Sequence, residues 1–151
     1  MDTGDDVPDN DPFYCGMAAY EPMQEEQAEW LKSIVKESWF QDAPHKVLFC
    51  HFPLWFEHPD LPDNRFKGHL HCRKLWLPTL LEAGVKLVVS GHTHDYVWMP
   101  ANEDQPIPQL VGGAPNPKYA TFIQGTATKE VLKLKMIKLD GTMIADVNLP
   151  A

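Results

Sequence analysis

The feature that most constrains this chain is an apolar run that ends in two histidines. Residues 85–94 read Val-Lys-Leu-Val-Val-Ser-Gly-His-Thr-His. A β-branched run of this length between polar neighbours predicts a strand buried on both faces, as in parallel or mixed sheets. Such sheets bind ligands at the carboxyl ends of their strands, and we expect Gly91 to allow a sharp backbone turn there. His92 and His94 are therefore candidate metal ligands or general bases, the alternative being two surface histidines beside a strand.

A second apolar run also ends in a histidine. Residues 46–50 read Lys-Val-Leu-Phe-Cys and precede His51. Apolar residues at helical spacing over 73–82 predict a helix between the two runs, so the two strands would be parallel neighbours joined by a right-handed crossover. This arrangement brings His51, His92 and His94 to one edge of a sheet. Three convergent imidazoles suit a divalent transition metal.

The remaining patterns predict a covering helix and a β-rich end. Pro22, followed by glutamates, marks a helix start, and the helix should end near Pro44. Its predicted inner face carries Trp30, Leu31, Ile34, Val35 and Ser38. Residues 107–111 predict a short strand before Gly112-Gly113, which we interpret as a turn. From Tyr119 onward the alternation predicts strands, with Asp140-Gly141 as a hairpin turn.

Two segments lack helical or strand periodicity. Residues 1–20 form a predicted acidic loop, in which Asp5 or Asp6 could bind a metal, although exposed acidic residues are the simpler interpretation. Residues 52–73 form a predicted lid-like loop, rich in proline, aromatic residues and histidine, with Trp55 and His58 as candidate substrate-lid residues. An ordinary surface loop is the alternative. Residues 69–72, which include two histidines and a cysteine, are expected to begin the next helix rather than bind a metal.

Composition narrows the classes of function. The net charge of −8 argues against a general nucleic-acid or membrane-surface binder, because both need a basic face. The 3 cysteines are an odd number without C-x-x-C spacing, so neither a disulfide framework nor a zinc knuckle is predicted. No apolar run approaches the roughly 18 residues of a membrane span, and we expect no signal peptide.

Two motifs carry a resemblance to a known family. The strings "CHFPLW" at 50–55 and "SGHTHDY" at 90–96 resemble the last two motifs of the calcineurin-like metallophosphoesterases, closest to their purple acid phosphatase-like branch. The strings "EEQAEWL" at 25–31 and "LDGTMIADV" at 139–147 resemble further segments of those proteins. The resemblance implies an α/β fold: half of an αββα sandwich, with a mixed sheet and C-terminal antiparallel strands.

The resemblance also implies a chemistry. Two divalent or mixed-valence metal ions, of manganese, iron or zinc, would bridge a hydroxide that attacks the phosphorus of a phosphate mono- or diester. His51 and His92 would bind one metal and His94 the other. Asp95 would orient a ligand imidazole, with an exposed turn aspartate as the alternative.

The departures from the family pattern matter equally. The motifs Asp-x-His, Gly-Asp-x-x-Asp and Gly-Asn-His-Asp/Glu, which supply the bridging aspartate and the remaining ligands, do not occur in this sequence. The string at residues 4–8 fails the second motif because Pro8 stands where an aspartate is needed, and "DTGDD" at 2–6 resembles the loop that follows these motifs. We therefore expect residues 1–151 to be the C-terminal part of such a domain.

This expectation has consequences for activity and assembly. Three neutral histidines do not offset the repulsion between two dications, so the chain alone should be inactive. The exposed edge of a half-sheet would allow a homodimer. A non-catalytic binding or interaction domain that retains the scaffold is the alternative. A mononuclear zinc hydrolase that uses the same three histidines is ranked last.

Overall fold

The computed structural model describes residues 1–5, 7–56 and 68–151. The helices are η1 (Pro12–Tyr14), α1 (Tyr20–Ile34), α2 (Ser38–Gln41) and α3 (Gly68–Glu82). The strands are β1 (Val47–Phe49), β2 (Leu87–Ser90), β3 (Val97–Met99), β4 (Gln109–Val111), β5 (Thr121–Ala127), β6 (Val131–Lys138) and β7 (Met143–Pro150). None of the helices in these ranges is long and apolar enough to cross a lipid bilayer.

The strands form two separate sheets. The first has the order β1-β2-β4-β3, in which β1, β2 and β4 are parallel and β3 runs antiparallel to β4. The second is the antiparallel sheet β5-β6-β7, in which the predicted hairpin turn at Asp140-Gly141 joins β6 to β7. The parallel pairing of β1 with β2, and the class of a mixed α/β fold with C-terminal antiparallel strands, are thus confirmed. The finer description as half of an αββα sandwich stays a prediction.

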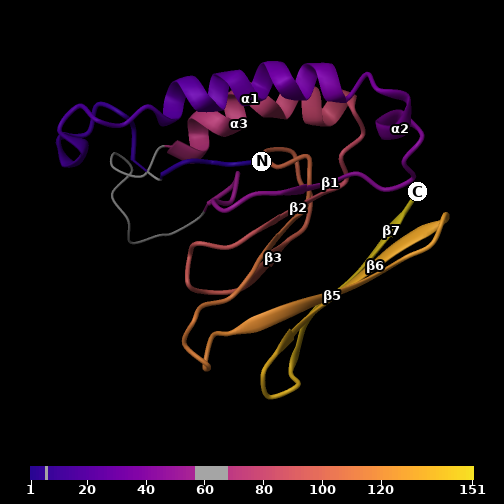
Figure 1. Ribbon diagram of the computed structural model, residues 1–151. Coiled ribbons are helices and arrows are strands. Elements are labelled where there is room, and N and C mark those ends of the chain that lie inside the picture. The colour runs from indigo at the N-terminus through magenta and orange to yellow at the C-terminus, as the bar shows by residue number, and fades with distance from the viewer. Residues whose placement is uncertain (6, 57–67) are drawn as a thin grey trace.

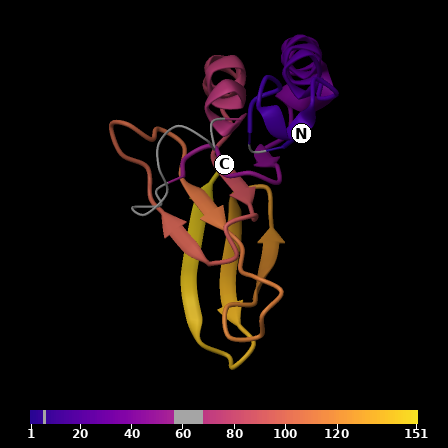
Figure 2. The same cartoon turned by 90° about the vertical axis from the view of Figure 1, so that its left-hand side faces the viewer.

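The elements stack in three layers. Helices α1 and α3 lie on one side of the first sheet and the second sheet lies on the other (Figures 1 and 2). Alternate residues of the strands serve the two interfaces, because successive side chains point to opposite faces. Leu48 and Val88 pack toward the helices, whereas Leu87 and Leu110 pack against β6 and β7. Strand β2 is therefore buried on both faces, as its apolar run predicts.

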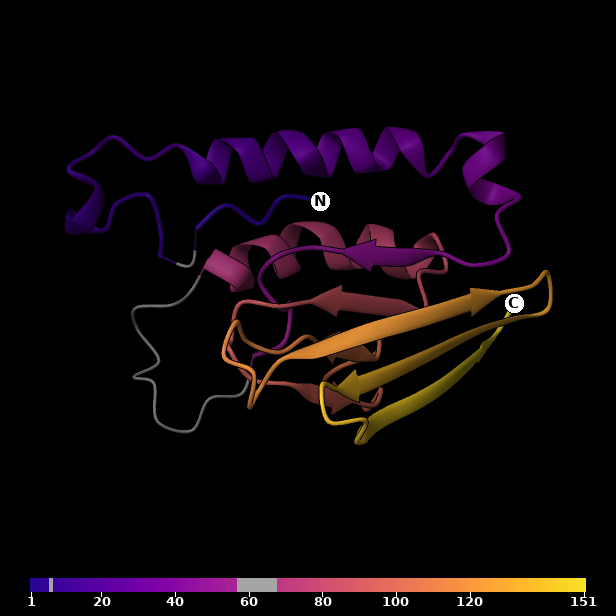
Figure 3. The ribbon, with the colours of Figure 1, turned by 60° about the horizontal axis from the view of Figure 1, so that its bottom comes forward.

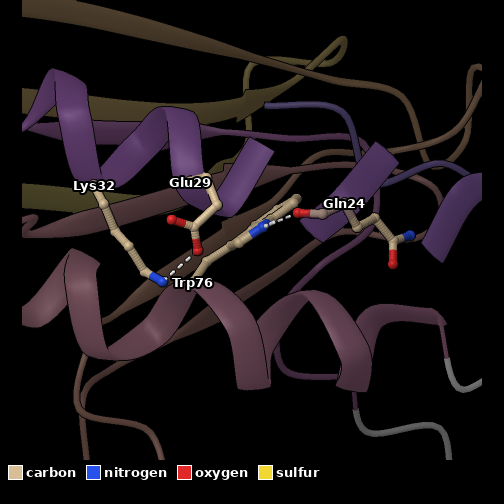
Figure 4. Close-up of polar contacts among 4 residues, drawn as sticks. All are labelled: Gln24, Glu29, Lys32 and Trp76. Carbon is tan, nitrogen blue, oxygen red and sulfur yellow. Dashed lines mark hydrogen bonds and ion pairs between the residues drawn. The ribbon is translucent and has the colours of Figure 1, made fainter. Parts of the chain in front are cut away.

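The helical layer is fixed by contacts between α1 and α3. The indole nitrogen of Trp76, a fully buried residue of α3, donates to the backbone oxygen of Gln24 on α1 at 3.2 Å (Figure 4). Gln24, Ala28 and Leu31 form the buried face of α1. The prediction that Trp30 lies on this face is wrong, because its side chain is 52% exposed. Trp30 is two residues beyond Ala28, which turns it about 200° around the helix.

The helix predicted over residues 73–82 begins earlier than the spacing of its apolar residues indicates. Helix α3 starts at Gly68 rather than near Arg73, so residues 69–72 form its first turns and the predicted start there is confirmed. Residues 68–73 of the lid-like loop predicted for 52–73 are therefore helical, and residues 57–67 lie outside the described residues. Pro78 lies inside this helix.

The first three residues lie along the carboxyl end of β1 and beside α1 (Figure 3). The Met1 ammonium group donates to the backbone oxygen of Phe49 at 2.8 Å. The Thr3 hydroxyl accepts from the backbone nitrogen of Phe52 at 3.0 Å, and the Thr3 backbone oxygen accepts from the Gln24 side chain at 2.7 Å. The start of the predicted acidic loop is thus anchored in the fold. The homodimer that the sequence predicts through this sheet edge stays a prediction.

Candidate functional site

Two histidines meet where β1 and β2 end. His51 follows β1 and His92 follows β2, and the two parallel strands end level because the backbone nitrogen of Gly91 donates to the oxygen of His51 at 3.0 Å. The Nε2 atom of His51 lies 3.3 Å from the Nδ1 atom of His92, within hydrogen-bonding distance. We call His51, His92 and His94 the histidine corner. The parallel pairing of two strands that each end in a histidine is what brings the first two imidazoles together.

The histidines themselves make the turn after β2. His92 has a φ of 72° and His94 a φ of 56°, both in the left-handed region that non-glycine residues seldom adopt. The expectation that Gly91 makes this turn is wrong, because its φ lies outside that region. Each left-handed non-glycine residue costs about 1–3 kcal/mol, and such strain concentrates at functional sites. The chain thus has histidines at two positions where glycine would adopt the backbone conformation with less strain.

The environment of His92 keeps its imidazole neutral. Burial, together with the imidazoles of His51 and His94, lowers the pKa of His92 from its usual 6.5 to about 4, and the Asp5 carboxylate opposes this change. The Phe52 ring packs edge-on against the imidazole, with 4.0 Å between the ring centroids. A neutral imidazole is the form that binds a metal. Asp5, a candidate from the acidic loop, therefore influences the histidine corner through its charge.

The spacing of the imidazole pair fits one metal ion. Two nitrogens bound to the same tetrahedral metal at about 2.0–2.1 Å lie about 3.3–3.4 Å apart, and the His51–His92 distance is 3.3 Å. However, the described residues do not bring three histidine, cysteine, aspartate or glutamate side chains together in a metal-binding group. The described part of the chain therefore presents a pair of ligands rather than a complete set.

The other sequence candidates have different surroundings. The Asp95 carboxylate accepts a hydrogen bond from the backbone nitrogen of Tyr96 at 2.8 Å and is exposed, which suits a turn residue. Trp55 is buried rather than overhanging, and lines a pocket of about 470 Å³ that also borders His94. His58 and Asp6 lie outside the described residues.

A buried glutamine that the sequence analysis missed holds the segment after β1. The Gln109 side chain lies in the core of β4, where its oxygen accepts from the backbone nitrogen of Leu54 at 2.8 Å. Its nitrogen donates to the backbone oxygen of Trp55 at 2.7 Å. These bonds fix the position of Trp55. The only signal in the sequence is a glutamine within the predicted strand at 107–111, where an apolar residue would be ordinary.

On another side of the pocket, the backbone at Gly113 lies close to the backbone at Tyr119. A Cβ atom added at Gly113 would lie 1.8 Å from the backbone oxygen of Tyr119, a residue that lines the pocket. The backbone nitrogen of Gly113 also donates to the Thr121 hydroxyl at 2.8 Å. The turn that we interpret from Gly112-Gly113 is therefore a point where only glycine fits.

The nearby thiol is unsuited to catalysis. Burial raises the pKa of Cys50, which immediately precedes His51, to about 12. Its sulfur donates to the backbone oxygen of Phe52 at 3.1 Å. Because the thiolate is the nucleophilic and metal-binding form, Cys50 acts as a packed neutral group beside the histidine corner.

A positively charged hollow lies at the opposite end of the first sheet. This hollow, of about 590 Å³, is bordered by three lysines and one acid, Lys32, Lys36, Lys46 and Glu82, and Lys46 directly precedes β1. The histidine corner lies after the other ends of β1 and β2. An anion that approached the histidines would therefore not meet these three lysines.

Comparison with known proteins places this arrangement in context. The sequence model described as calcineurin-like phosphoesterase matches residues 8–96, a range that includes β1, β2 and the whole histidine corner. Serine/threonine-protein phosphatase CPPED1 of Homo sapiens is 30% identical over 86 residues, and that of Danio rerio is 28% identical over 85 residues. Both alignments cover 56% of this chain, but only 27% of the human and 28% of the zebrafish protein.

Proposed function

The chain belongs to the calcineurin-like phosphoesterase family, and on that premise we propose that it forms part of a metal-dependent enzyme that hydrolyses phosphate mono- or diesters. The family supports a hydrolase whose substrate is a phosphate ester, and the family generally uses divalent metals. The motifs at 50–55 and 90–96 favour its purple acid phosphatase-like branch.

The observation that carries the proposal is the distance of 3.3 Å between His51 Nε2 and His92 Nδ1. The two residues follow neighbouring parallel strands, and these two atoms are spaced as two ligands of one metal ion would be. In this proposal His51 and His92 bind one metal of a pair as neutral imidazoles, and His94 binds the other. Manganese, iron and zinc all accept such ligands.

The metals would supply the charge that the surrounding side chains lack. Bound divalent metals lower the pKa of a water molecule and offset negative charge on the phosphate. The chain's own residues hold and shield the ligands. Phe52 packs against His92 and limits its contact with water, and the packing of β1 against β2 fixes the separation of the two imidazoles.

The remaining ligands are part of the proposal. Two dications about 3.5–4 Å apart need a carboxylate between them, and the described residues hold no complete metal-binding group. We propose that the missing carboxylates come from the family's earlier motifs on a longer protein, of which these residues are the C-terminal part. The chain by itself should then have little or no activity.

Hydrolysis of p-nitrophenyl phosphate tests this proposal. With manganese or zinc added, we expect the chain to hydrolyse the ester no faster than its His92→Ala variant. A longer protein that joins this segment to a Gly-Asn-His-Asp/Glu motif should hydrolyse it, and His92→Ala should abolish that rate. Activity of the chain alone that disappears in His92→Ala would contradict the proposal that the chain holds only part of the metal ligands. An active longer protein that His92→Ala leaves unchanged would contradict the assignment of function.

A second candidate is a non-catalytic binding domain that retains the scaffold. It is favoured by one observation, that no three potential ligands converge among the described residues. The sequence directly upstream in the genome discriminates between the two candidates. An in-frame Gly-Asn-His-Asp/Glu motif before residue 1 would support the enzyme, and an upstream reading frame without any of the family's acidic motifs would support the binding domain.

A further inference from the structure

An aromatic pocket adjoins the histidine corner on the side of His94. Its volume of about 470 Å³ lies within the usual range for small-molecule sites of about 300–1,000 Å³. Trp55 and Phe56 reach it from the segment after β1, Tyr96 comes from the segment after β2, and Tyr119 comes from the connection between β4 and β5. We call this hollow, which His94 and Asp95 also border, the aryl pocket.

The lining of the aryl pocket favours a flat apolar group. Four of its residues are aromatic, and aromatic rings gain from offset or edge-on contact with another ring beyond the burial of area. A hollow of this size is also much larger than the side chain of a serine or threonine. The shape and chemistry therefore suit a six-membered aromatic ring better than a short alkyl chain.

The charge of the pocket restricts the ring further. Among the described residues that line it, Asp95 carries a full negative charge and none is a lysine or arginine. Lys118 and Lys138 lie over the rings of Tyr119 and Tyr96, at 4.9 Å and 5.5 Å from the ring centroids, and neither borders the pocket. Asp95 is thus the one acidic or basic residue among the described lining residues apart from His94, so a second negative charge on the bound ring would border a carboxylate, whereas the two ammonium groups lie outside the lining.

The walls are held in place before any ligand binds. The indole nitrogen of Trp55 donates to the backbone oxygen of Asp104 at 3.1 Å, and the Trp55 backbone is held by Gln109. The backbone of Tyr119 is held by its close approach to Gly113. Walls that are already ordered lose little freedom on binding, which favours affinity.

We propose that the aryl pocket binds the aromatic leaving group of the substrate, so that the substrates are aryl phosphates whose ring carries no further negative charge, as in a phosphorylated phenol of the tyrosine type. This inference rests on the proposed function, because the histidine corner is the place where the phosphate would bind. His94 links the two parts, because it borders the aryl pocket and its imidazole lowers the pKa of His92.

Binding of 4-methylphenol to the metal-free chain, followed by protein NMR, tests the pocket without requiring activity. We expect saturable shifts of the Trp55 indole and Val97 amide signals, and binding at least about fivefold tighter than that of 2-propanol, a short aliphatic alcohol. Val97 lines the pocket, is 41% exposed and begins β3, so Val97→Trp should fill the pocket without disturbing the core. This variant should weaken binding about tenfold or more.

Matched controls make the outcome decisive. Leu81→Trp adds the same side chain at an exposed position of α3 and should leave binding unchanged. The anionic ring of 4-hydroxybenzoate should bind at least about threefold more weakly than 4-methylphenol, and Asp95→Asn should reduce that difference. Unsaturable binding, equal binding of 2-propanol, equal binding of the anionic ring, or unchanged affinity in Val97→Trp would each overturn the proposal.

Metal content measured on the same samples separates the two proposals. A chain that binds metal through His92 but not 4-methylphenol would refute the aryl pocket and leave the phosphoesterase proposal standing. A chain that binds 4-methylphenol but no metal would refute the metal site, and with it the assignment of the bound ring as a leaving group.

Discussion

The two halves of the site are built in opposite ways. The histidine corner is made by side chains on a strained backbone, with left-handed φ angles at His92 and His94. The shape of the aryl pocket depends on backbone contacts: the buried side-chain amide of Gln109 binds the segment after β1, and Gly113 lies close to the backbone of Tyr119. The strained backbone of the histidine corner therefore lowers the stability of the protein. The contacts that shape the aryl pocket raise it. Substitutions should separate the two.

The largest difference is expected between two glycines. Gly113→Ala should destabilise the protein by about 3 kcal/mol or more, because the new Cβ would lie 1.8 Å from a backbone oxygen. Gly91→Ala, beside the histidine corner, is the matched control. Its Cβ would have no neighbour within 4 Å, so the change should be below about 1 kcal/mol. Urea unfolding at a constant m value measures both, and equal losses would remove the contrast between the halves.

A smaller effect is expected at the buried amide. Gln109→Leu should cost about 2–3 kcal/mol in unfolding free energy, because it leaves the Leu54 nitrogen and the Trp55 oxygen without their buried partner. It should also weaken 4-methylphenol binding while metal binding by the histidines persists. Gln124→Leu, at an exposed position of β5, is the control and should change stability by less than about 0.5 kcal/mol. A Gln109 variant as stable as this control would show that the amide does not hold the pocket.

The smallest predicted change in stability, at His94, should be an increase rather than a loss. In the metal-free protein His94→Gly should raise stability by about 0.5 kcal/mol, because glycine adopts a positive φ without strain. Thr93→Gly, whose residue lies between the two left-handed histidines and has an ordinary φ, should lower stability by about 0.5–1 kcal/mol. Thermal unfolding in the presence of a chelator compares the two. If both variants lose stability equally, His94 is not held in a strained conformation.

The sequence predicts the histidine corner better than the aryl pocket, for a physical reason. His51 and His92 each follow an apolar run, and a helix is predicted between the two runs. Two strands joined in this way usually pair in parallel, so the order of the elements along the sequence is enough to predict that the two histidines lie close together. The pocket depends on contacts between residues far apart in the chain, such as Gln109 with Leu54 and Gly113 with Tyr119. Periodicity carries no information about such pairs, and a glutamine in a short strand looks like a surface residue.

Two errors have the same origin at a smaller scale. The helical spacing predicts Trp30 on the inner face, yet the buried face of α1 is set by Gln24, whose side-chain nitrogen donates to the backbone oxygen of Thr3. Gly91 was expected to turn the chain because glycine turns easily, yet the turn is made by the histidines. In both cases a local sequence pattern favoured one residue, and a specific contact or backbone constraint selected another. The position of a helix face or a turn therefore needs the partner as well as the residue.

The most direct test of the central claim is the number of metal ions per chain, measured by elemental mass spectrometry after saturation with manganese or zinc and desalting. We predict one metal ion per chain, which is lost in His92→Ala and in His51→Ala. His45→Ala, at a histidine whose Nε2 atom contacts the backbone oxygen of Thr128, should keep the metal. Two metals per chain, or one that persists when His92 is replaced, would contradict the account of a half-site built on these two imidazoles.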